Sequence, residues 1–149
     1  MKTNEILEAY KVLQNAKYQK LSDDGKVKVW KITRLLKPVA TQFKEDVQDA
    51  QQKLMPDGDF LQRLGKAMQY EQDKKNERTP AITDEEYQAI VKEVTEYNQL
   101  VNKAVQEFSE KDVELKFEAL SDEDFGKLMA SNDWTMAEVE KIEFISIGL

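Results

Sequence analysis

The sequence predicts a mainly α-helical protein with a small C-terminal strand, and the spacing of its apolar residues leads to that fold class. Two long stretches repeat an apolar residue every three or four positions, as one side of an α-helix does. A stripe of this kind follows a partner helix in left-handed pairing. We therefore expect a long antiparallel helical hairpin in which the stripes bury each other. They consist of Val29, Ile32, Leu36, Val39, Phe43, Val47, Ala50 and Leu54, and of Tyr87, Ile90, Val94, Tyr97, Val101, Ala104 and Phe108.

The first half of the chain predicts two helices. One runs from Thr3 to about Tyr18, and the second follows a polar turn, with Ser22 as its N-cap, and extends to about Met55. An alternation over residues 26–29 is compatible with a strand, but the longer stripe favours helix. Pro38 lies inside this second helix, where we expect it to kink or divide the helix.

The middle of the chain predicts a helical hairpin tip. Met55-Pro56-Asp57-Gly58-Asp59 breaks the second helix, and a shorter helix follows from Phe60 to about Gln72. Residues 73–82 are highly charged and form an exposed connection. Thr83, with Glu86 three residues later, is a capping box that opens the second long helix, which extends to about Glu110.

After residue 112 the apolar period changes from helical spacing to two. Residues 113–119 alternate apolar and charged side chains, which predicts a half-buried strand with Ile145 to Leu149 or another subunit as its partner. Ser121 caps a short helix, and Thr135 with Glu138 forms a second capping box. We expect one domain, residues 1–149, with a hairpin region at 1–111 and an acidic β/α cap at 112–149.

The composition limits the chemistry that the chain can perform. Its 149 residues include neither histidine nor cysteine, so the commonest general base, the usual zinc ligand and the thiol nucleophile are all missing. No glycine-rich phosphate loop or nucleophile elbow occurs. We expect no enzyme activity, no catalytic residues and no cofactor. With no signal peptide and no apolar stretch of about 20 residues, we also expect a cytoplasmic protein.

The charge is unevenly distributed along the chain. Residues 107–149 carry 4 basic and 12 acidic side chains, although the net charge of the whole chain is only -7. Residues 17–44 carry 8 basic side chains and 2 acidic ones, with Trp30 in the middle. Two readings are open: solvated helix faces, or a surface for an oppositely charged partner, nucleic acid included. An overall pI near 4.8 makes nucleic acid the less favoured partner.

Paired carboxylates leave a third function open. Five pairs of acidic residues lie three positions apart, and facing pairs of this type bind Mg²⁺ in all-α nucleotide pyrophosphatases. Chance alone gives roughly five or six pairs in so acidic a chain. Asp46 with Asp49, opposite Glu93 with Glu96, is the arrangement that could form a metal hydrolase, and we predict that it does not form a metal site.

The order of these parts resembles a family of small uncharacterised proteins encoded by tailed bacteriophages and prophages. The resemblance covers most of the chain and rests on Lys31-Ile-Thr-Arg-Leu-Leu-Lys-Pro38, on Val113-Glu-Leu-Lys-Phe117, on Leu120-Ser-Asp-Glu-Asp-Phe125 and on Trp134-Thr-Met-Ala-Glu-Val-Glu-Lys-Ile142. The segment from Met55 to Met68 is an insertion relative to that family. The resemblance implies an interaction or assembly role and carries no catalytic residues.

Together these observations predict a non-catalytic protein-interaction or assembly protein that forms a homodimer. The alternatives are a nucleic-acid or replication accessory factor that uses residues 17–44, and a carboxylate-metal hydrolase. Aromatic and cationic residues within the stripes or next to them are the candidates for contacting a partner. They are Trp30, Lys28, Lys31, Arg34, Tyr87 and Tyr97.

Overall fold

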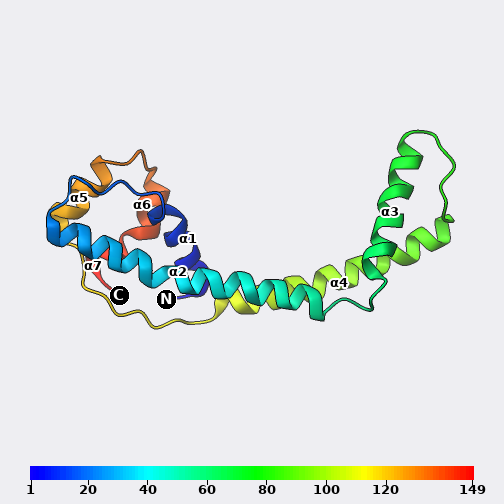
Figure 1. Ribbon diagram of the computed structural model, residues 1–149, viewed down its shortest axis with the longest axis horizontal. Coiled ribbons are helices and arrows are strands. Elements are labelled where there is room, and N and C mark those ends of the chain that lie inside the picture. The colour runs from blue at the N-terminus through cyan, green and yellow to red at the C-terminus, as the bar shows by residue number, and fades with distance from the viewer. The chain divides into compact units, whose positions relative to one another are not determined.

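The computed structural model describes residues 1–149 and is mainly helical, with 71% of the residues in helices and no strand (Figure 1). The elements are α1 (Thr3–Leu13), α2 (Asp23–Lys53), α3 (Phe60–Lys75), α4 (Asp84–Glu110), α5 (Asp122–Ala130), α6 (Met136–Ile142) and α7 (Phe144–Ile147). Contacts group them into two units. Unit 1 comprises Met1–Glu45 with Glu107–Leu149, and unit 2 comprises Asp46–Gln106.

Unit 1 has the larger apolar core, and both ends of the chain contribute to it. In Figure 1, α1, α5, α6 and α7 gather around the first part of α2. Several residues of this core are completely inaccessible to solvent, among them Ile6, Leu36, Leu128 and Ile142. Burial of such side chains contributes about 1.5–3 kcal/mol each. The core also includes Ala9, Leu13, Leu21, Val29, Ile32, Leu115, Leu120, Phe144 and Ile145.

This core corrects the predicted pairing for the first part of the α2 stripe. Val29, Ile32 and Leu36 on α2 are buried, but they pack with residues of α1 and the C-terminal segment, and no residue of α4 belongs to that core. Helical spacing specifies which side of a helix is buried and leaves open what covers it. Within unit 2, the end of α2 does contact α4, because the Tyr97 hydroxyl donates a hydrogen bond to the Gln51 carbonyl at 2.8 Å.

The strand predicted at residues 113–119 is wrong. The alternation is real, since Leu115 is buried between the exposed residues Glu114 and Lys116, but no neighbouring backbone forms a ladder with it. The segment is hydrogen bonded only at its ends. Val113 donates to the carbonyl of Met1 at 2.8 Å, and Leu120 donates to the carbonyl of Ile145 at 2.7 Å. The expected partner strand was Ile145 to Leu149, but residues 145–147 belong to the single turn α7 instead.

The predicted helix starts agree with the structure. The Ser121 side chain accepts a hydrogen bond from the Asp124 amide, and Thr135 forms a complete capping box with Glu138. The Thr83 hydroxyl accepts from the Glu86 amide at 3.1 Å. Pro38 was expected to kink or divide the second helix. It does not divide it, because α2 continues through Pro38, and the kink stays a prediction. The apolar face on both sides of Pro38 packs on the unit 1 core, which offsets the missing backbone hydrogen bond.

Unit 2 buries fewer apolar residues than unit 1. Its buried residues are Ala50, Phe60, Ala67, Ile90 and Val101, two of which are alanines. Aromatic pairs between α3 and α4 supplement them: Phe60 packs against Tyr97, with ring centroids 4.8 Å apart, and Tyr70 stacks on Tyr87 at 4.1 Å. These contacts fix which side of α3 faces α4.

None of the helices combines the length and the hydrophobicity that a membrane span needs. The prediction of one domain over residues 1–149, divided at residue 111 into a hairpin region and a cap, stays a prediction. The contacts instead place residues 107–149 in the same unit as residues 1–45.

Candidate functional site

A pocket of about 320 Å³ lies beside Trp30 in unit 1. The Trp30 side chain is 48% exposed, and the Arg34 guanidinium carbon lies 5.0 Å from the centre of its ring, a cation–π contact. We call this the Trp30 pocket. Its lining contains three aromatic rings and two cations but no carboxylate: it consists of Tyr10, Leu13, Gln14, Tyr18, Trp30, Thr33, Arg34 and Lys37.

The connection between α1 and α2 carries one wall of this pocket and is held by the C-terminal segment. The Asn132 side chain accepts a hydrogen bond from the Lys17 amide and donates one to the Lys17 carbonyl, both at 2.9 Å. α1 ends at Leu13, five residues before the end predicted from the sequence, and these two hydrogen bonds hold the connection that follows it. They also fix the backbone next to Tyr18, which lines the pocket.

The start of α2 is fixed by a buried carboxylate. Asp124 is 6% exposed and accepts hydrogen bonds from the Ser22 amide at 2.8 Å and from the Ser22 hydroxyl at 2.6 Å. These bonds, foremost the one from the hydroxyl, lower the pKa of Asp124 below its ordinary value. Gly25 makes this approach possible, because a Cβ atom there would lie 2.4 Å from an Asp124 oxygen. These contacts therefore hold the start of α2, the helix that carries Trp30, in place.

The sequence candidates in α2 divide between two pockets. Trp30 and Arg34 line the Trp30 pocket, whereas Lys28 and Lys31 line a second pocket of about 260 Å³ that also contains Phe117 and Glu118. Lys28 pairs with Asp24 at 2.8 Å, and that hydrogen bond raises the pKa of Lys28. The sequence candidates did not include Tyr10, Tyr18 or Lys37. A search for aromatic residues near the basic segment would have found the two tyrosines, and Lys37 belongs to that segment itself.

In unit 2, α3 has one side covered by α4 and one side open. Phe60 and Ala67 are buried, and Tyr70 is partly buried on the same side, with spacings of seven and three residues. Tyr87 and Tyr97, both sequence candidates for partner contact, are occupied within the unit. The Tyr97 ring packs on Phe60, and the Tyr87 hydroxyl donates to Glu71 at 2.6 Å while its ring stacks on Tyr70.

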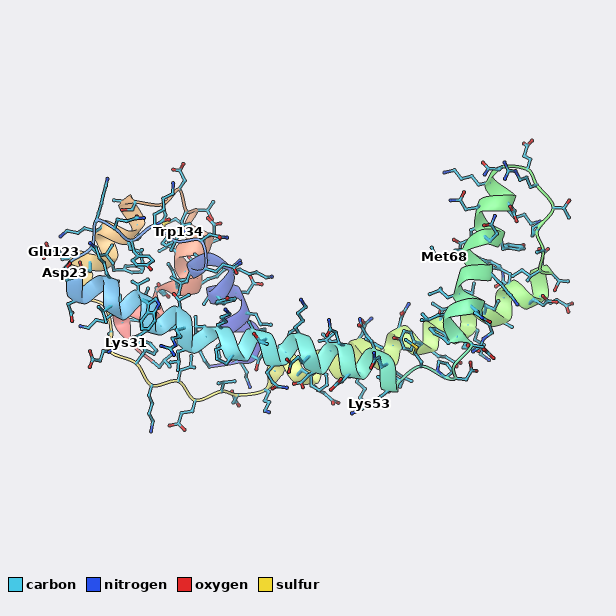
Figure 2. The ribbon with its side chains drawn as sticks, viewed as in Figure 1. Asp23, Lys31, Lys53, Met68, Glu123 and Trp134 are labelled. Carbon is cyan, nitrogen blue, oxygen red and sulfur yellow. The ribbon has the colours of Figure 1, made fainter.

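The open side of α3 presents two large apolar residues to solvent. Leu61 and Met68 are each 60% exposed and lie seven residues apart, with Gly65 between them. An added Cβ at Gly65 would meet nothing within 4 Å. Figure 2 labels Met68 on the side of α3 away from the segment that leads into α4. We call Leu61, Gly65, Met68, Gln72 and Lys75, which repeat at spacings of four and three, the α3 outer face.

A charged cluster ties the start of α3 to α4. The Arg63 guanidinium donates two hydrogen bonds of 2.9 Å to Asp57 and also pairs with Glu93. These contacts raise the pKa of Arg63 and lower that of Asp57. Glu93, one of the carboxylates considered for metal binding, is therefore bound to a cation. No group of three or more carboxylates in the chain is placed to hold a metal ion.

A wider pocket of about 560 Å³ has acidic residues of α1 and α6 along its rim. Lys141 forms an ion pair of 2.7 Å with Glu8 there, and this bond lowers the pKa of Glu8. The pocket also includes Met1, Phe144, Ile147 and Leu149. Comparisons with protein-family models, with curated proteins and with solved structures find no match for this chain.

Proposed function

We propose that this protein is a non-catalytic interaction or assembly protein, encoded by a tailed phage or prophage, that acts in the cytoplasm as a homodimer. The α3 outer face is the surface that joins the two copies. The absence of histidine and cysteine supports a role without catalysis, and a chain without cysteine suits a reducing compartment. The resemblance in the order of its parts supports the phage origin.

The observation that carries this proposal is the exposure of Leu61 and Met68 on a helix whose other side is fixed. Large apolar side chains exposed together on one face are typical of protein contact sites. Aromatic and ionic contacts hold α3 against α4, so the face is presented without a further conformational change. Binding to a preorganised surface loses less conformational entropy.

A second copy of this chain is the occupant that the pattern favours. In a two-fold symmetric contact, each residue of the patch must fit its counterpart on the same patch. Two antiparallel α3 helices that cross near Gly65 place Leu61 of one copy beside Met68 of the other. Gly65 lacks a side chain and allows the two helices to approach closely, as small residues do at helix crossings.

Light scattering over a wide concentration range tests this proposal. The unmodified chain is expected at twice its mass of 17.3 kDa, and Met68→Glu at the monomer mass. Gly65→Gln should have the same effect, because an exposed helical position tolerates glutamine in the monomer but the bulk blocks the crossing. Leu100→Glu is the matched control, since Leu100 is 51% exposed but lies on α4. Circular dichroism confirms that each variant remains folded.

A monomer at all concentrations would refute the dimer. A dimer that Met68→Glu and Gly65→Gln leave intact would refute the α3 outer face as its interface.

A further inference from the structure

The Trp30 pocket continues into a line of exposed cations on α2. Trp30, Arg34, Lys37, Thr41 and Lys44 follow one another at spacings of four and three residues, and each is exposed. They therefore share one side of the helix. At a rise of 1.5 Å per residue, the line extends for about 21 Å along unit 1. We call it the α2 cationic stripe.

Acidic residues are missing from this part of α2 and from the pocket, although the chain as a whole is acidic. No aspartate or glutamate occurs between residues 25 and 44, and none lines the Trp30 pocket. Before this range, Asp23 and Asp24 form ion pairs with Lys26 and Lys28. After it, the exposed Glu45 directly follows Lys44, so the range free of acidic residues ends with the stripe. Arg34, Lys37 and Lys44 are exposed and form no ion pair with a carboxylate, so a ligand can reach them.

We propose that the Trp30 pocket and the α2 cationic stripe bind single-stranded nucleic acid without sequence preference. Bases stack on the exposed indole of Trp30 and on the tyrosine rings of the pocket, and the phosphates lie along Arg34, Lys37 and Lys44. Stacking on aromatic side chains beside a cationic track is how proteins bind single strands. The guanidinium of Arg34 already lies on Trp30, and its plane is itself a surface on which a base stacks.

The dimensions and polar groups of the site agree with this ligand better than with duplex DNA. A pocket of about 320 Å³ beside an indole admits an unstacked base, which a duplex does not offer. Gln14 and Thr33 supply hydrogen-bonding groups at its edge. The stripe contains only a few cations, so it suits a strand of a few nucleotides. Modest affinity with a shallow salt dependence is expected.

Fluorescence anisotropy with labelled oligo-dT and oligo-rU of 15 nucleotides tests the proposal on the full chain. For three phosphate contacts, the logarithm of the binding constant should fall against the logarithm of salt concentration with a slope of about -2. Arg34→Ala with Lys37→Ala should reduce the slope to about -0.7. Lys66→Ala with Lys103→Ala removes the same charge from unit 2 and should leave the slope unchanged. Equal binding of the two oligonucleotides indicates a site that ignores the 2′-hydroxyl.

A second comparison separates stacking from simple charge attraction. Trp30→Ala should weaken binding at least fivefold, because stacking of one base is worth about 1–3 kcal/mol, whereas Trp30→Phe should retain most of the affinity. Since Trp30 is half exposed, both variants are expected to fold, which circular dichroism verifies. Met68→Glu should bind the oligonucleotides as the unmodified chain does, so this test is independent of the dimer.

Two results would overturn the proposal. One is the absence of binding to either oligonucleotide at low salt. The other is binding that Trp30→Ala does not weaken and that polyglutamate displaces as well as oligo-dT does, because the surface would then be a general site for acidic protein segments.

Discussion

Unit 1 and unit 2 are both helical, but different interactions hold them together. Unit 1 has a core of thirteen buried apolar residues that come from both ends of the chain. Unit 2 has five buried apolar residues and relies on aromatic pairs and ion pairs at its surface. Surface ion pairs contribute only about 0–1 kcal/mol each. Because unit 2 has fewer buried contacts, we expect it to open locally while unit 1 remains folded.

The largest expected effect comes from truncating a core residue in each unit. Leu36 is completely buried in unit 1, so Leu36→Ala should lower the free energy of global unfolding by about 2–5 kcal/mol. Ile90→Ala in unit 2 should shift mainly an earlier, partial transition. Denaturant unfolding followed by circular dichroism measures both. Equal effects of the two substitutions on a single cooperative transition would contradict the claim that the two units unfold separately.

The contact between Gly25 and Asp124 provides a prediction within unit 1. Asp124→Ala leaves the Ser22 amide and hydroxyl without their acceptor, which should cost about 1.5–3 kcal/mol. Gly25→Ala should cost about 1–3 kcal/mol in the natural chain, because the new Cβ displaces the Asp124 carboxylate. In the Asp124→Ala background the same substitution should cost much less. Additive effects in this double-mutant cycle would show that the two residues do not act on each other.

Acid should weaken unit 1 through Asp124. Its pKa in the folded protein is lower than in the unfolded chain, so the unfolded state binds the proton more readily. The stability contributed by Asp124 is therefore complete above its ordinary pKa of 3.8 and is lost as the pH falls through the lower folded value. In denaturant titrations at a series of pH values, Asp124→Asn should reduce the fall in the free energy of unfolding at low pH. If the variant loses as much stability in acid as the unmodified chain does, Asp124 is not the cause of that loss.

Alkali should weaken unit 2 by a smaller amount. The hydrogen bond from the Tyr70 hydroxyl to Asp84 raises the pKa of Tyr70 to about 12. Because the folded pKa is higher than the unfolded one, the contribution is present below the ordinary pKa of 10.0 and is lost as the pH rises toward 12. The absorbance of tyrosinate during an alkaline titration should show one fewer high-pH group in Tyr70→Phe. An identical titration of the variant would contradict the assignment.

The sequence predicted the local features of this fold better than its long-range packing. Ser121, Thr83 and Thr135 mark helix starts because each satisfies amides within its own first turn. The predicted end of α1 lies five residues beyond the observed one at Leu13, and the backbone of the following connection is held by the Asn132 side chain, 115 positions from Lys17. The alternation at residues 113–119 correctly indicated that Leu115 is buried and that Val113 and Phe117 are half-buried, but Ala119 is exposed. A strand also needs a partner, which the pattern does not supply.

The candidate site was predicted in part for the same reason. Trp30 and Arg34 lie one helical turn apart, so a single helix brings them together. Tyr10 and Tyr18 reach the same pocket only through the packing of α1 and the following turn. The apolar residues that predict the helix α3 do not all lie on the same side of it. Phe60 is buried, whereas Leu61 and Met68 are exposed. A short helix with apolar residues on both sides does not reveal which side is covered.

Amide hydrogen exchange under native conditions tests the difference between the units most directly. We predict that amides of α3 and of residues 84–100 exchange at least ten times faster than those of α1, of residues 29–36 and of α5. That ratio corresponds to a local opening about 1.4 kcal/mol or more below global unfolding. Equal protection in both sets of helices would contradict the account, because the chain would then unfold as one cooperative structure.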